Sequence, residues 1–194
     1  MTSLSEPKLA PPGAGLPLPE LLIGRMLFGL RRLTGNRDSF DERFKRERTA
    51  IRALLKDVDR VSLAQRVLIQ RPPGLEDSSR YWSVLMTLDH LRIVHLAFVG
   101  IFVALGDGKI PEGKASTATV KPNLAVTTAV LAEYEASCDA LLAAVAVVPD
   151  LRTSVRFAHP WFGPMDAYGW HALAGGHMGI HRVQIERILA GLNG

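Results

Sequence analysis

The stretch that decides the fold is residues 83–105, SVLMTLDHLRIVHLAFVGIFVAL. Its apolar and aromatic residues recur in steps of three and four from Leu88 to Leu105, which is the spacing of one face of an α-helix. Polar positions are so few that such a helix needs other elements around most of its surface. The stretch therefore predicts a long, buried helix at the centre of the protein.

The positions of the 12 prolines mark where further helices can run, because proline breaks a helix interior. The proline-free intervals predict four more helices: Pro19 to about Leu33, Asp38 or Ser39 to about Val58, residues 123–148 starting at Asn123 or Thr127, and Asp166 to Gly194. No stretch alternates as a strand does, and no repeat of 20–50 residues occurs. The predicted fold class is all-α, an antiparallel four-helix bundle with an extra N-terminal helical segment.

A length of 194 residues fits one domain with an appendage. Five of the prolines lie within residues 7–19, which predicts an extended arm outside the fold. The expected division is therefore an arm plus apolar helical segment over residues 1–37 and a helix-bundle domain over residues 38–194.

The composition, 47% hydrophobic and 22% charged, is that of a globular protein. The only cysteine, Cys138, excludes an internal disulfide and is predicted to be a buried, inert thiol. Near the N-terminus the apolar run Leu21–Leu30 is interrupted by Arg25 and is shorter than the ~20 residues that span a bilayer. The first residues also lack the pattern of a secretory signal. We expect a cytoplasmic protein with no membrane partner.

The net charge of +4 comes from an excess of basic residues in the first third of the chain. A basic cluster lies in the second predicted helix and is interleaved with acidic residues: Arg43, Lys45, Arg46, Arg48 and Arg52 alternate with Asp41, Glu42 and Glu47. This mixture is typical of a solvated helix face. No nucleic-acid motif accompanies it, so no nucleic-acid partner is expected.

Two histidines in the last predicted helix, His177 and His181, are four residues apart and so lie on one face of it. His90, within the apolar stretch quoted above, is the natural third donor. Three imidazoles suit zinc, nickel, iron or copper. The alternative is that hydrogen bonds satisfy these histidines within the core.

The other histidines do not fit such a site. His95 is five residues from His90, about 140° round the helix, and is expected to be a core or interface residue. His159 and His171 are expected to be structural or exposed.

Two segments carry a family resemblance: YWSVLMTLDHLRIVHL at 81–96 and HPWFGPMDAYGWHALAGGHMGIHRVQIERIL at 159–189. They are similar to the WS…HL and HPxFG…W…H…HxxQ motifs of the DinB-like (DinB/YfiT) superfamily, and the resemblance extends over residues 38–194. It implies a four-helix bundle and a divalent metal, nickel or zinc foremost and iron as a third choice. The ligands it implies are His90, His177 and His181.

Members that the chain resembles include metal-dependent thiol transferases, which implies transfer of a low-molecular-weight thiol to a small electrophile. Trp161, Phe162, Trp170 and Gln184 are then the predicted pocket residues. A metal-dependent hydrolase and a non-catalytic, stress-associated binding or structural bundle are the alternatives. The resemblance and the apolar Leu21–Leu30 face together predict a homodimer.

Overall fold

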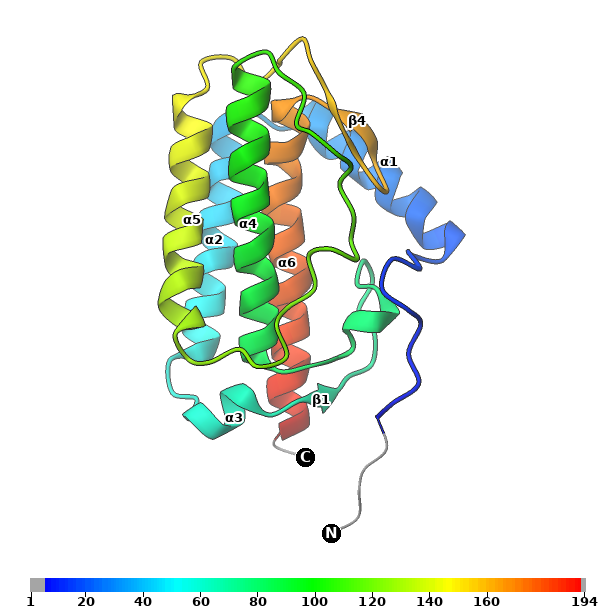
Figure 1. Cartoon of the computed structure of the whole chain (residues 1–194), viewed down its shortest axis with the longest axis vertical. Coiled ribbons are helices and arrows are strands. Elements are labelled where there is room, and N and C mark those ends of the chain that lie inside the picture. The colour runs from blue at the N-terminus through cyan, green and yellow to red at the C-terminus, as the bar shows by residue number, and fades with distance from the viewer. Residues whose placement is uncertain (1–5, 193–194) are drawn as a thin grey trace.

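A computed structural model describes residues 6–192 of the chain. Residues 1–5 of the predicted arm, and Asn193 and Gly194 at the predicted end of the last helix, lie outside the described residues. Four long helices run side by side as a bundle (Figure 1): α2 (Arg37–Leu55), α4 (Val84–Gly106), α5 (Val130–Val147) and α6 (Ala167–Leu192). Helix α2 packs on α6, α5 packs on α4, and α4 packs on α6. The predicted four-helix bundle is confirmed.

Shorter elements join and flank these helices: α1 (Leu18–Thr34), α3 (Arg60–Ala64), a 3₁₀ turn η1 (Asp77–Ser79), β1 (Val67–Leu68), β2 (Tyr81–Trp82), β3 (Phe157–His159) and β4 (Gly163–Met165). Strand β1 pairs antiparallel with β2, and β3 with β4. The prediction of no strands was wrong for these two small ladders. Each strand has only two or three residues, too few to show an alternating pattern.

Helix α4 is the central helix, and the Ser83 side chain caps it by accepting a hydrogen bond from the Met86 amide. By length and composition α4 could also cross a membrane, with a mean hydropathy of 1.7 over its most apolar window. Within the bundle, however, 56% of that window is buried. Its apolar character is that of a core helix, which packs between α5 and α6.

Two helix starts differ from those predicted. Helix α2 begins at Arg37 because Asn36, two residues before the predicted cap, forms a reciprocal capping box with Ser39. Helix α5 begins at Val130, later than predicted. The amide of Asn123 is held by the Asp89 carboxylate at 2.8 Å, which keeps that segment in a turn.

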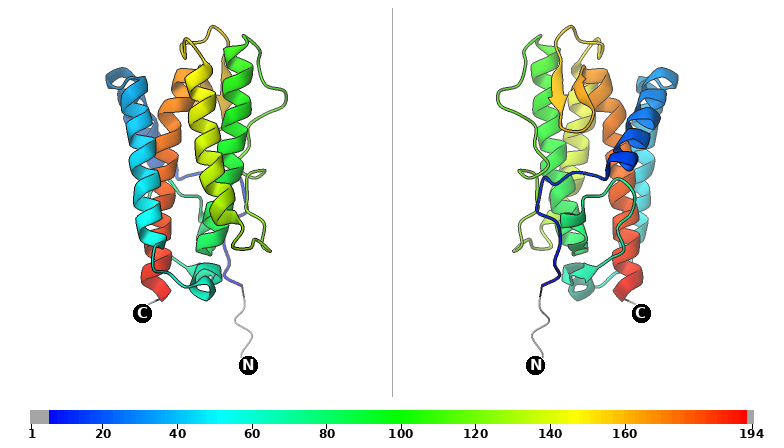
Figure 2. Two further views of the ribbon diagram at one scale, coloured as in Figure 1. Left: turned by 90° about the vertical axis from the view of Figure 1, so that its left-hand side faces the viewer. Right: turned by 90° about the vertical axis from the view of Figure 1, so that its right-hand side faces the viewer.

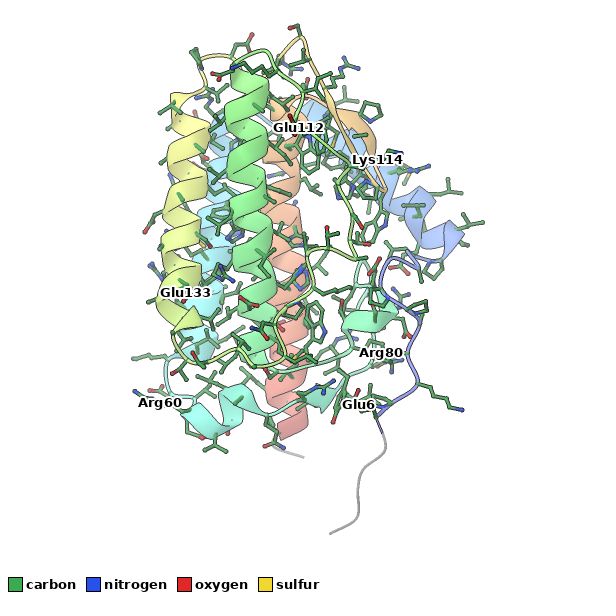
Figure 3. The ribbon with its side chains drawn as sticks, viewed as in Figure 1. Glu6, Arg60, Arg80, Glu112, Lys114 and Glu133 are labelled. Carbon is green, nitrogen blue, oxygen red and sulfur yellow. The ribbon has the colours of Figure 1, made fainter. Side chains whose placement is uncertain are left out.

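Helix α1 lies across the outside of the bundle beside α6 (Figure 2). It begins and ends close to the predicted positions, but none of its residues is buried. The sequence had predicted that the Pro-rich arm preceding α1 lies outside the fold. In the structure this arm instead contacts the rest of the protein. The amide of Ala10 donates to Asp77 at 2.8 Å, and Glu6, near the lower end of the arm, pairs with Arg66 at 2.7 Å (Figure 3).

Two further features concern the core, and the first of them, a buried thiol, was predicted from the sequence. Cys138 is completely buried, and burial raises the pKa of its thiol to about 12, so the thiol is protonated near neutral pH. Gly175 lets α6 approach α2 closely, because a Cβ there would lie 3.2 Å from the amide nitrogen of Phe44.

Candidate metal centre

Helices α4 and α6 bring three histidines together inside the bundle. The Nε2 atom of His177 lies 3.2 Å from the Nε2 atom of His90 and 3.2 Å from that of His181. Suitable nitrogen atoms of all three rings lie within 4.8 Å of one another. The structure thus brings together the three histidines that the sequence selected as ligands.

Two of the rings, those of His90 and His181, have hydrogen-bond partners outside the cluster. These partners fix which ring nitrogen carries the proton and which one faces the cluster with a lone pair. The Nδ1 atom of His90 lies 2.7 Å from the carbonyl oxygen of Val120. Because a carbonyl only accepts hydrogen bonds, this Nδ1 carries the proton and the Nε2 atom of neutral His90 has a free lone pair. The backbone of the segment between α4 and α5 therefore orients this ring.

Gln184 orients His181 by the same logic. Its amide nitrogen donates to the carbonyl oxygen of Ser79 at 2.7 Å, which directs its amide oxygen to Nδ1 of His181, also at 2.7 Å. Nδ1 of His181 must then be the donor, and Nε2 faces the cluster with a lone pair. A second contact of this kind is typical of histidines that bind metals.

All three imidazoles are held neutral. Burial lowers the pKa of His90 to about 4, and burial together with the neighbouring rings lowers the pKa values of His177 and His181 well below their ordinary value. Only His177 can supply an N–H to the cluster, and one proton cannot serve both neighbours at once. A lone pair therefore remains unsatisfied, and a divalent cation is compatible with this donor set.

Trp82 forms one wall of the cluster. Its ring stacks on that of His181, with the planes 7° apart and the centroids 6.4 Å apart, and lies 5.3 Å from the ring of His90. His177 is only half-buried, so the cluster is most accessible at this residue. Trp82 was not selected from the sequence, although it belongs to the quoted WS…HL motif.

The four predicted pocket residues lie in different places. Gln184 is at the cluster, whereas the other three contact the ring of His159 and have no ring contact with the three cluster histidines among the described residues. Phe162 packs on Phe28 of α1, with ring centroids 4.6 Å apart, and the carbonyl of Trp161 accepts a hydrogen bond from α1. Trp170 is buried against Phe98, with ring centroids 5.1 Å apart. These three aromatic residues support the junction between α1, α4 and the β3–β4 hairpin.

A cavity of about 330 Å³ lies between the arm and the β1–β2 ladder. It shares Trp82 with the histidine cluster, and Met86 and Lys121 also line it. Lys121 lies over the Trp82 ring at 5.4 Å and forms an ion pair with Glu76 at 2.8 Å. The volume lies at the lower end of the range for small-molecule sites.

Comparisons with known proteins agree with this architecture. The family model of the DinB superfamily matches residues 43–185. Among solved structures, a chain described as TT2238, a four-helix bundle protein, matches with a TM-score of 0.57 and 24% sequence identity. The match covers 78% of this chain and 98% of that one, and at this identity it bears on the fold alone. No curated protein matches the chain.

Proposed function

The chain belongs to the DinB superfamily, and from this premise we propose that it is a metal-dependent thiol transferase. His90, His177 and His181 hold one divalent ion, nickel, zinc or iron, through their Nε2 atoms. The substrates are a low-molecular-weight thiol and a small electrophile.

The observation that carries the proposal is the convergence of three neutral imidazoles whose outer nitrogens are held in place. A purely structural zinc site has four protein ligands, whereas three leave a coordination position open for a substrate. Among the described residues, only these three histidines group as candidate ligands around one point. A bound divalent ion supplies thiolate chemistry by lowering the pKa of a coordinated thiol.

The protein's own residues supply position and access. Val120 and Gln184 fix the planes of two imidazole rings, so little reorganisation is needed when a ligand binds. Trp82 shields the cluster from water on one side. The half-buried side at His177 offers both substrates their approach.

A hydrolase is less well supported, because it would need a carboxylate free to act as a general base. Two buried carboxylates, Asp89 beside His90 in sequence and Glu76 paired with Lys121 at Trp82, are already engaged. Asp89 accepts hydrogen bonds from Arg92 and from the amide of Asn123. Glu76 accepts one from Thr117 in addition to its ion pair with Lys121.

The experiment begins with elemental analysis of the untagged protein beside a His90→Ala, His177→Ala double variant. The metal-loaded protein is then assayed with a panel of low-molecular-weight thiols and small electrophiles. We expect near-stoichiometric metal and metal-dependent conjugation in the native protein and neither in the variant. Metal without conjugation would refute the transferase. A metal-free protein, even after reloading and with stability unaffected by EDTA, would support the non-catalytic bundle.

A further inference from the structure

Helix α1 is oriented opposite to an ordinary surface helix. An amphipathic helix on a globular protein turns its apolar stripe toward the core and its charges toward solvent. The charged residues of α1 instead bind the rest of the protein: Glu20 accepts from Arg71 and the Gly74 amide, Arg25 donates to the Trp161 carbonyl, Arg31 donates to the Ser39 carbonyl, and Arg32 pairs with Asp166. These bonds fix α1 in one orientation.

The opposite face of α1 is wholly apolar and open to solvent. Its seven large side chains are between 56% and 84% exposed: Leu18, Leu22, Ile23, Met26, Leu27, Leu30 and Leu33. We call this set the outer face of α1. Within α1, which the structure describes in full, no charged residue belongs to this set. Figures 1 and 2 show the helix lying outside the four-helix bundle, so the bundle does not cover this face.

The area of the outer face is that of an interface. A fully exposed residue of this size has a surface of roughly 200 Å². The exposed fractions of the seven residues then add up to about 900 Å². The largest apolar patch on a typical monomer is about 300–600 Å². A standard protein interface buries about 800 Å² on each partner. The outer face therefore matches the share of a single partner in a stable complex.

We propose that a second copy of this chain covers the outer face of α1. The two α1 helices pack against each other across a two-fold axis near Met26, the middle residue of the helix. A two-fold interface requires a patch that is complementary to itself. An uncharged apolar face meets this requirement, because no like charges meet across the axis and both copies bury apolar area.

The charges of α1 favour a second copy over a lipid surface. Helices that lie on membranes carry Lys and Arg on the polar face, where these residues reach lipid phosphates. In α1, Arg31 and Arg32 are partly buried and bonded to Ser39 and Asp166, and the exposed Arg25 is bonded to the connection between β3 and β4. Arg32, for example, is 3.0 Å from the Asp166 carboxylate. The helix is therefore a fixed platform for a protein surface.

The test is the mass in solution of the native protein and two matched variants, measured by sedimentation equilibrium. Met26→Glu places a charge at the centre of the outer face, and Val61→Glu places one at an equally open site on α3, where Val61 is 77% exposed. We expect twice the 21.2 kDa of one chain for the native protein and Val61→Glu. We expect a monomer for Met26→Glu, with dimer affinity at least about 100-fold weaker.

A cross-linking experiment locates the axis independently of stability. Cys138 is completely buried and does not take part, so Met26→Cys supplies the only accessible thiol. Mild oxidation should link Met26→Cys into a disulfide-bonded dimer and leave Val61→Cys, itself a non-covalent dimer, without a covalent link between its chains. A native monomer at high concentration, or a dimer that survives Met26→Glu and gives no Met26→Cys cross-link, would overturn the proposal. So would binding of monomeric native protein to vesicles of phosphatidylcholine and phosphatidylglycerol that Met26→Glu abolishes.

Discussion

Helix α4 carries two buried histidines that differ in one respect. His90 directs Nδ1 to the Val120 carbonyl and Nε2 to another imidazole nitrogen, that of His177 at 3.2 Å. His95 also bonds through Nδ1, to the Ser137 hydroxyl at 3.0 Å, but its Nε2 is buried without a hydrogen-bond partner among the described residues. Both rings are almost inaccessible to solvent, at 6% and 1% exposed.

Helix α6 repeats the contrast. His181 is held by Gln184 on one side and faces His177 on the other. His171 bonds through Nε2 to Asp41 at 2.9 Å, and its Nδ1 has no partner within residues 6–192. Burial is therefore common to the two kinds of histidine and does not mark a ligand. What distinguishes the candidate ligands is that their free lone pairs converge on one another.

The largest effect should come from His90→Ala. We expect metal affinity to fall on the order of 10³-fold, because one of three protein ligands is lost from the total binding free energy of the site. Competition of the untagged protein against a chelator of known affinity measures this loss. Unchanged affinity would mean that His90 is only a core residue and would remove the distinction between the histidines of α4.

The matched variant on the same helix is His95→Ala. Here we expect the metal content to stay at the native level while the free energy of unfolding falls by about 3 kcal/mol, since a buried ring is replaced by a cavity. Urea denaturation and elemental analysis of one preparation measure both quantities. If His95→Ala folded but lost its metal, the ligand set would have to include His95.

A smaller effect should follow from Gln184→Leu, which keeps the three ligands and removes the group that orients His181. Loss of such an outer contact typically weakens metal affinity about 10- to 100-fold. A matched control is Gln70→Leu, in the connection between β1 and η1. Gln70 is exposed, whereas Gln184 is buried and contacts both His181 and Ser79. Equal affinities for the two variants would show that Gln184 does not orient the ring.

Much of the bundle could be predicted from the sequence, because apolar residues in long buried helices recur every three or four positions. Residues 83–105 gave the boundaries of α4 within a residue, since Ser83 is a strong cap before an apolar run. The start of α5 could not be read in this way, because a contact from Asp89, remote in the sequence, holds the turn at Asn123. The orientation of α1 was also hidden, since periodicity shows two faces without saying which one packs.

The features of the candidate site also differ in whether they depend on nearby or remote parts of the sequence. The four-residue spacing of His177 and His181 is local, so the sequence places both on one face of α6. The carbonyl of Val120 that orients His90 has no side-chain signal, because any residue provides a carbonyl. Trp161 and Phe162 lie close to the last helix in sequence and Trp170 lies within it, yet the β3–β4 hairpin turns Phe162 toward α1. Proximity along the chain did not predict proximity in space.

The smallest effect concerns the two core histidines, His95 and His171, which should contribute differently to the pH dependence of the free energy of unfolding. Burial lowers the pKa of His95 to about 3, against an ordinary value near 6.5 in the unfolded chain. As the pH falls through 6.5, the unfolded chain takes up a proton that the folded protein excludes until about pH 3. The free energy of unfolding therefore falls over this window, and His95 accounts for about 2 kcal/mol between pH 7 and pH 5.

His95→Leu should remove this share, and urea denaturation of the metal-free protein at each pH measures it as the difference between the native and variant curves. His171→Leu should remove less. Burial also lowers the pKa of His171, but the Asp41 carboxylate favours the charged ring and opposes the shift. Equal differences for the two variants would mean that Asp41 does not stabilise the imidazolium. The two core histidines would then be distinguished from the ligands but not from each other.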